Sequence, residues 1–224
     1  MSNFIRVKIC CISSVEEAML AIEYGASALG LVSEMPSGPG VIDERLIAEI
    51  TLRIPPPIAT FLLTSKQNAE EIIVQQLKTK VNTLQLVDHV PYSELQKLRK
   101  QLAGIKIVQV IHILDDNSVE EALRVQEYVD ALLLDSGNPK LDVKELGGTG
   151  RIHNWKISRE IKDKASVPVF LAGGLNPENV LEAIKTIQPY GLDICNGVRT
   201  KNQLDEEKLK LFFERVNKFN SSQV

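Results

Sequence analysis

The sequence predicts a single (β/α)8 barrel that takes in residues 1–224. Short β-branched apolar runs alternate with amphipathic segments of helical length, and this pattern occurs eight times along the chain. Strands that alternate with helices in this way require right-handed crossovers and a parallel sheet buried on both faces. The length of 224 residues suits one closed barrel, and no linker or low-complexity tract divides the chain.

In the first half of the chain, each apolar run is taken as a strand and the amphipathic segment after it as a helix. The prolines Pro55, Pro56 and Pro57 end the second helix and force an extended entry to the third strand. The expected pairs of strand and helix are Arg6–Cys10 with Val15–Tyr24, Ala28–Val32 with Asp43–Arg53, Ile58–Leu62 with Asn68–Lys78, and Thr83–Val87 with Tyr92–Ala103.

The second half repeats the pattern up to the last residues, 220–224, which we expect to form a frayed tail. Asn176 is positioned to cap a helix whose first turn contains Pro177, so the seventh strand must stop before them. Two loops that follow strands, Ser33–Ile42 and Ser136–Trp155, are long enough to suggest a function. The expected pairs are Lys106–His112 with Val119–Tyr128, Ala131–Asp135 with Lys156–Lys164, Val167–Ala172 with Pro177–Ile187, and Gly191–Asn196 with Glu206–Phe219.

Charge and composition point to a small-molecule partner. Lys and Arg number 26 against 29 acidic residues, so the net charge is -3. The chain therefore lacks the excess of positive charge that binds nucleic acid or an anionic membrane. No apolar run is long enough to span a bilayer, and Met1–Lys8 lacks the apolar core of a secretion signal, so we expect a cytoplasmic protein. The three cysteines are too few for a disulfide framework and are expected to be free thiols.

Cys10 and Asp135 are the two candidate catalytic residues, because active sites of such barrels lie at the carboxyl ends of the strands. Side chains alternate along a strand, so Lys8 shares the inward face with Cys10 and is expected to bind substrate. Asp135 ends an otherwise apolar strand, and the ends of strands one and six face each other across the opening. A substrate therefore has room between the thiol and the carboxyl.

This pair suits the isomerisation of an amino sugar, in which one group protonates the ring oxygen and another removes a proton from the neighbouring carbon. Asp135 would be the acid and Cys10 the base, with both pKa values moved toward neutrality. An alternative interpretation stays open: Cys10 is then a small core residue, and Asp135 caps the loop that follows it.

A phosphate site is expected in the loops after strands seven and eight, where this fold often places one. Gly173 and Gly174 lead into the capped helix, so their backbone can approach an anion near the positive helix end. After strand eight, Asn196 and Gly197 form a second glycine turn, with Arg199 as the nearest added positive charge. The alternative is that both segments are ordinary turns.

The remaining polar motifs carry weaker indications. The segment 147–150, Gly-Gly-Thr-Gly, is either a phosphate nest or the hinge of a lid. His112 ends strand five and either lines the site or is a hydrogen-bonded residue of the rim. The histidines have no metal-ligand spacing and no dinucleotide or P-loop motif occurs, so we expect neither a metal nor a cofactor.

Five motifs follow one another along the chain: Lys8-Ile9-Cys10, Gly25-Ala26-Ser27-Ala28-Leu29-Gly30, Leu132-Leu133-Leu134-Asp135, Gly147-Gly148-Thr149-Gly150 and Leu171-Ala172-Gly173-Gly174-Leu175-Asn176-Pro177-Glu178-Asn179-Val180. With these motifs, nearly the whole chain resembles the phosphoribosylanthranilate isomerase family. The resemblance implies a (β/α)8 barrel that converts N-(5-phosphoribosyl)anthranilate to its 1-deoxyribulose isomer in tryptophan biosynthesis without a cofactor. It also implies that Cys10 is the base and Asp135 the acid.

The chain also departs from the pattern of that family. Cys11 stands where the family normally has glycine, and Met35–Gly40 lacks the arginine that holds the anthranilate carboxylate in the family. Arg151 and Arg199 are candidate replacements. Val87-Asp88 replaces the usual His-Gly of strand four, and Cys195–Arg199 replaces the usual Ser-Ser-Gly-Val-Glu near strand eight.

These departures leave three hypotheses open. The first is a phosphoribosylanthranilate isomerase, and the second is a paralogous isomerase of another phosphorylated amino sugar. The third is a non-catalytic barrel that binds phosphosugars. In each case the partner is a small phosphorylated molecule, and the protein is expected to be a monomer or a homodimer.

Overall fold

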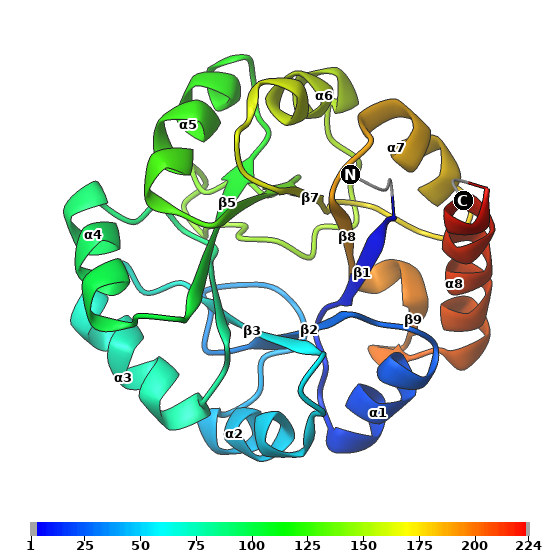
Figure 1. The fold of residues 1–224 in the computed structure, drawn as a ribbon, viewed down its shortest axis with the longest axis horizontal. Coiled ribbons are helices and arrows are strands. Elements are labelled where there is room, and N and C mark those ends of the chain that lie inside the picture. The colour runs from blue at the N-terminus through cyan, green and yellow to red at the C-terminus, as the bar shows by residue number, and fades with distance from the viewer. Residues whose placement is uncertain (1–3, 223–224) are drawn as a thin grey trace.

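The computed structural model describes residues 4–222, and in it eight parallel strands close into a barrel inside a ring of helices (Figure 1). Each strand pairs with its sequence neighbours, and the last strand pairs with the first to close the ring. The predicted (β/α)8 barrel is therefore confirmed. The barrel strands are β1 (Arg6–Ile9), β2 (Ala28–Val32), β3 (Ala59–Thr64), β4 (Thr83–Leu86), β5 (Lys106–His112), β6 (Ala131–Asp135), β7 (Val169–Leu171) and β8 (Gly191–Ile194).

The helices begin where polar side chains satisfy the first free backbone N–H groups. Asp43 and Asn68 each accept two such hydrogen bonds, and Ser14 and Asp205 each accept one. The helices are α1 (Val15–Glu23), α2 (Glu44–Arg53), α3 (Ala69–Thr79), α4 (Tyr92–Gln101), α5 (Asn117–Val125), α6 (Trp155–Lys164), α7 (Val180–Ile187) and α8 (Glu206–Ser221), with 3-10 turns η1 (Gln126–Tyr128) and η2 (Asn196–Val198).

Two apolar clusters fill the protein. The larger lies between the sheet and the helices and contains residues such as Ile9, Leu29 and Phe212, all fully buried. The smaller contains Phe61 and Phe170, whose rings meet edge to face at 6.1 Å. Because side chains alternate along each strand, the second cluster fills the barrel interior and supports whatever lies at the carboxyl ends of the strands.

The start of α7 differs from the prediction. The helix begins at Val180 rather than at Pro177. The side-chain oxygen of Asn176 accepts the N–H groups of Glu178 and Asn179, each at 3.0 Å, and so closes a separate turn before the helix. The prediction that Asn176 caps the helix is therefore wrong, because the backbone N–H groups that its side chain binds belong to this turn.

The prediction of a frayed tail at residues 220–224 is wrong for its first part. α8 continues to Ser221, and Asn220 is buried. The Asn220 side chain accepts the Ile5 N–H at 2.8 Å and donates to the Ile5 carbonyl oxygen at 3.1 Å. These bonds fasten the end of the chain to the entry of β1, whereas Gln223 and Val224 lie outside the described residues.

The segment after η2 folds into a small hairpin that the sequence did not predict. β9 (Arg199–Thr200) pairs antiparallel with β10 (Gln203–Leu204), and two residues with positive φ, Lys201 and Asn202, make the turn. The hairpin is relevant to the site because it carries Arg199. Within residues 4–222, no helix is long and apolar enough to cross a membrane.

Candidate active site

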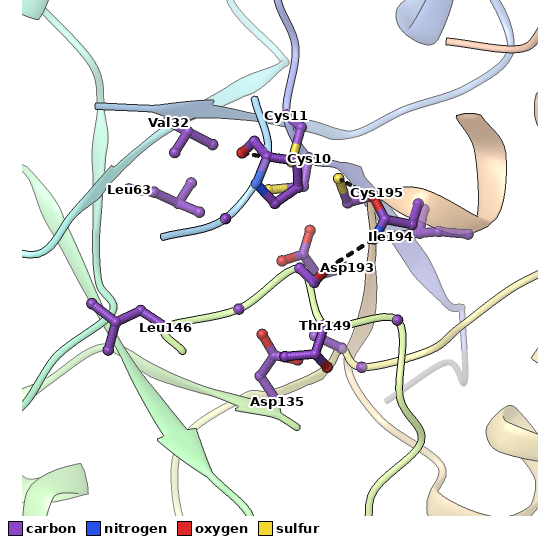
Figure 2. A pocket seen from close by; sticks show the side chains of 18 of the residues that line it. Cys10, Cys11, Val32, Leu63, Asp135, Leu146, Thr149, Asp193, Ile194 and Cys195 are labelled. Atoms are coloured by element: carbon purple, nitrogen blue, oxygen red, sulfur yellow. Dashed lines mark hydrogen bonds between the residues drawn. The ribbon is translucent and has the colours of Figure 1, made fainter. Parts of the chain in front are cut away.

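A cavity of about 250 Å³ opens at the carboxyl ends of the strands, and residues from the ends of β1 and β6 line it (Figure 2). Six of the predicted site residues line this cavity, and the structure brings them together from four strand ends. Lys8 and Arg199 are the two predicted residues that do not line it. The six are Cys10, Asp135, Gly173, Gly174, Asn196 and Gly197.

Cys10 directly follows β1, and its side chain is 6% exposed. A Cβ at Gly30, on the neighbouring strand β2, would lie 2.8 Å from both the Cys10 Sγ and the Lys8 Nζ. Glycine therefore leaves the space in which the thiol and the ammonium group lie close to one another. The contact with the Cys11 thiol lowers the pKa of Cys10, as does the charge of Lys8, and together they outweigh burial.

Lys8 is fully buried below the cavity floor, where its Nζ lies 2.8 Å from the Asp193 Oδ1. Lys8 and Asp193 are register partners on β1 and β8, which explains how the pair forms inside the barrel. Burial lowers the pKa of Lys8, but the Asp193 carboxylate more than offsets this, and the net pKa is raised. Lys8 thus supplies a fixed positive charge beneath Cys10.

Cys11 has a backbone conformation that favours glycine, with φ of 62°. The family that the sequence resembles normally carries glycine at this position, and a positive φ explains that preference. The cysteine thiol contacts Cys10 and Cys195, and both contacts raise the pKa of Cys11. Cys11 therefore stays protonated beside the more acidic thiol of Cys10.

Asp135 ends β6, and its carboxyl is only 8% exposed. Its Oδ1 accepts the N–H of Ser136 at 2.7 Å, and a Cβ at Gly147 would lie 2.9 Å from its Oδ2. Burial raises the pKa of this carboxyl and outweighs the Ser136 hydrogen bond, which lowers it. Figure 2 shows Cys10 and Asp135 on opposite sides of the cavity, each from a different strand.

The glycines after β7 and β8 occupy positions that no larger residue fits. Gly173 and Gly174 have φ of 80° and 64°, and a Cβ at Gly174 would lie 2.7 Å from the backbone carbon of Arg151. A Cβ at Gly197 would lie 2.0 Å from the carbonyl oxygen of Leu175. The loops after β6, β7 and β8 thus approach each other through their backbones at this end of the cavity.

Asn196 joins two of these loops, because its side-chain N–H donates to the Gly148 carbonyl oxygen at 2.9 Å. The loop after β6 is also held by a hydrogen bond between the hydroxyl groups of Ser136 and Thr149, which lie 2.7 Å apart. Gly147, Gly148 and Gly150 all have positive φ. The segment 147–150 lines the cavity next to Asp135, and whether it acts as a hinge stays a prediction.

Arg199 does not contribute positive charge to the cavity, contrary to the prediction. Its guanidinium group forms a two-point ion pair with Glu17, at 2.9 and 3.0 Å, and donates to the Cys11 carbonyl oxygen at 2.6 Å. The side chain is 5% exposed. Arg199 therefore fastens the β9–β10 hairpin to the turn after Cys10, a role that needs tertiary contacts and has no signal in the sequence.

Two other predicted candidates also lie away from the cavity. The Nε2 of His112 lies 2.9 Å from the Val87 carbonyl oxygen, so His112 is a hydrogen-bonded residue of the rim. Arg151 pairs with Glu145 on the exposed surface and does not line the cavity. Neither Arg151 nor Arg199 replaces the arginine that the segment Met35–Gly40 lacks.

The sequence reasoning missed Gln85 and Asp193, which both line the cavity. Each is a polar residue at an inward position of a buried strand, a signal that the alternation rule could have revealed. The Gln85 Oε1 is buried and has no hydrogen-bond partner within residues 4–222. It is therefore available to accept a hydrogen bond from a bound molecule.

Comparison with known proteins agrees with this geometry. The family model for N-(5'-phosphoribosyl)anthranilate isomerase matches residues 7–215. N-(5'-phosphoribosyl)anthranilate isomerase 2 of Methanosarcina mazei is 37% identical over 213 residues, which are 94% of this chain and 93% of that protein.

Solved structures of the same family have the same fold. The phosphoribosyl anthranilate isomerase of Thermotoga maritima superposes with a TM-score of 0.83 at 27% identity, covering 96% of this chain and 99% of that one. A phosphoribosyl anthranilate isomerase in complex with reduced 1-(o-carboxyphenylamino)-1-deoxyribulose 5-phosphate superposes with a TM-score of 0.80 at 25% identity and the same coverage. The chain belongs to the N-(5'-phosphoribosyl)anthranilate isomerase family.

Proposed function

We propose that the chain isomerises N-(5'-phosphoribosyl)anthranilate to 1-(o-carboxyphenylamino)-1-deoxyribulose 5-phosphate, a step of tryptophan biosynthesis. The observation that carries the assignment of roles is the pairing of two buried groups across one cavity. The lowered Cys10 pKa favours a thiolate that can accept a proton, and the raised Asp135 pKa favours a protonated carboxyl that can donate one.

The first step is opening of the ribose ring. Asp135 donates its proton to the ring oxygen as the bond from that oxygen to the anomeric carbon breaks. The amine nitrogen supplies the electron pair that forms a carbon–nitrogen double bond. Burial favours this step, because it raises the pKa of the Asp135 carboxyl and so favours the protonated form that donates to the ring oxygen.

The second step moves a proton from carbon. The Cys10 thiolate removes the proton from the carbon next to the anomeric carbon. The released electron pair forms a carbon–carbon double bond, and the π electrons of the carbon–nitrogen double bond return to nitrogen to give an enolamine. Transfer of a proton from the Cys10 thiol to the former anomeric carbon, and of the hydroxyl proton of the next carbon to the Asp135 carboxylate, gives the ketone and restores both groups. Lys8, held by Asp193 below the floor, stabilises the thiolate that starts this step.

The phosphate is assigned to the glycine-built end of the cavity, at Gly173, Gly174 and Gly197. The absence of side chains there lets the backbone approach an anion. Phosphate sites in this fold often lie in the loops after the seventh and eighth strands. Asn196 supports this end by holding the loop after β8 against the loop after β6. A cytoplasmic location and the choice between monomer and homodimer stay predictions.

The test is turnover of N-(5'-phosphoribosyl)anthranilate by the purified chain, beside complementation of a tryptophan auxotroph that lacks this isomerase. We expect turnover and rescue by the wild-type chain. Cys10→Ala should lower kcat by about 10²–10⁴-fold, because one positioned acid or base contributes that much. Turnover that survives unchanged in Cys10→Ala would remove the thiol from the mechanism. No turnover by the wild-type chain would leave a phosphosugar-binding barrel as the better account.

A further inference from the structure

The end of the cavity away from the glycine loops is lined by apolar side chains. Val32 and Leu63 come from the ends of β2 and β3, Met35 from the loop after β2, and Leu146 from the loop after β6. Figure 2 shows Val32, Leu63 and Leu146 gathered on one side and Cys195 and Ile194 on the other. If the phosphate lies at the glycine end, this apolar end receives the amine substituent of the substrate.

The loop after β2 is packed so closely on Cys11 that it has no room for a side chain at position 40. A Cβ at Gly40 would lie 2.4 Å from the Cys11 Cβ and 2.9 Å from its Cα. The Cys11 Sγ also lies 3.7 Å from the Pro39 carbonyl oxygen. Cys11 and Gly40 are therefore complementary in shape, and Cys11 adds a neutral group to the cavity lining.

The charges around the cavity do not favour a carboxylate at the apolar end. Among residues 4–222, the charged side chains that line the cavity are Asp135 and Asp193, both acidic. The nearby basic groups have other partners, since Lys8 pairs with Asp193 and Lys144 with Asp88. A carboxylate that left water for this end would find no opposite charge, which makes its burial costly.

From these contacts we propose that the site does not select for a carboxylate on the amine substituent. It accepts N-(5-phosphoribosyl) derivatives of uncharged aromatic amines at least as well as N-(5-phosphoribosyl)anthranilate. The inference rests on the proposed function, since it concerns the amine half of the same substrate. The inference attributes specificity for the amine substituent to the apolar wall, the side chains of Val32, Met35, Leu63 and Leu146. Met35 is the residue at which a carboxylate preference can be introduced.

The experiment compares kcat/KM of the wild-type chain for N-(5-phosphoribosyl)anthranilate and N-(5-phosphoribosyl)aniline. We expect the aniline compound to equal or exceed the anthranilate compound. A site with a charge-assisted carboxylate contact would instead favour the anthranilate compound by about tenfold or more. A wild-type preference of that size would overturn the inference.

A variant tests the residue assignment. Met35→Arg places a cation at the apolar end on a longer, flexible side chain, and should shift the kcat/KM ratio by about tenfold toward the anthranilate compound. Met35→Leu is the matched control that keeps the wall apolar, and its ratio should stay that of the wild type. An unchanged ratio in a folded Met35→Arg protein would contradict the role of this wall.

Binding separates this inference from the proposed function. Calorimetry with two reduced, unreactive product analogues, one with and one without the ring carboxylate, needs no turnover. Equal affinities without turnover would refute the proposed isomerisation and support the neutral amine site. Tighter binding of the carboxylated analogue by about tenfold, or binding of neither analogue, would overturn the inference.

Discussion

Asp135 at the end of β6 and Asp193 on β8 are the same residue type in the same cavity, with exposures of 8% and 7%. Their partners differ. Asp193 lies 2.8 Å from the Lys8 ammonium group, whereas Asp135 accepts a hydrogen bond from the Ser136 N–H. Equal burial therefore does not give the two carboxyls the same role. The role depends on whether the neighbouring strand supplies a cation to pair with the carboxyl.

The two carboxyls therefore have different roles. Asp193 is a structural carboxyl, paired with a cation, and Asp135 is a chemical carboxyl, placed to transfer a proton. The Lys8–Asp193 pair is fixed by register, because the two residues face each other across the β1–β8 ladder. Asp135 has His112 as its register partner, but His112 directs its Nε2 to Val87. Asp135 is thus left with a raised pKa and an oxygen beside Gly147, as a proton donor requires.

Loss of the chemical carboxyl should have the largest effect. Asp135→Asn keeps the shape and the Ser136 hydrogen bond but removes the transferable proton, so kcat should fall by about 10²–10⁴-fold. Steady-state kinetics checks the fall, and binding of a reduced product analogue should stay within about threefold of wild type. A variant that loses binding as much as kcat would show that Asp135 holds the substrate instead.

Loss of Lys8, the partner of the structural carboxyl, should lower stability, besides removing the charge that lowers the pKa of Cys10. Lys8→Met leaves Asp193 buried without its cation, and the free energy of unfolding should fall by about 3–5 kcal/mol in urea denaturation. Because the pKa of Lys8 is raised in the folded state, this stabilisation is complete at neutral pH and is lost only as pH rises through the raised pKa.

Two variants control this measurement. Lys164→Met removes one partner of an exposed pair with Glu160, with side chains 53% and 49% exposed, and should cost less than about 1 kcal/mol. Adding Asp193→Asn to Lys8→Met should restore part of the lost stability, because the unpaired charge is removed. Equal losses in Lys8→Met and Lys164→Met would refute a special role for the buried pair.

The smallest expected effect is a gain of stability on removing the chemical carboxyl. The pKa of Asp135 is raised from 3.8 in the folded state, so the stability tied to its proton is complete below that pH and is lost as pH rises through the raised value. Asp135→Asn should therefore be more stable than wild type at pH 7, with the gain shrinking toward about pH 4. Thermal unfolding across this range checks it, and a gain independent of pH would point to another cause.

The sequence determined the barrel, because the alternation of apolar strands and amphipathic helices is local and repeats eight times. It also placed Cys10, Asp135 and the glycine turns at one end, since the carboxyl ends of parallel strands share an edge. The missed residues Gln85 and Asp193 were within reach of the same rule of alternating faces.

Only the tertiary structure decided which groups pair. Arg199 looked like a free cation in the sequence, yet it binds Glu17 from a segment 182 residues away. The fit of Cys11 against Gly40 likewise depends on how two loops pack. The physical reason is that periodicity fixes which face a side chain occupies, whereas its partner, and with it the charge and pKa of a site, depends on ångström-scale distances between segments far apart in the chain.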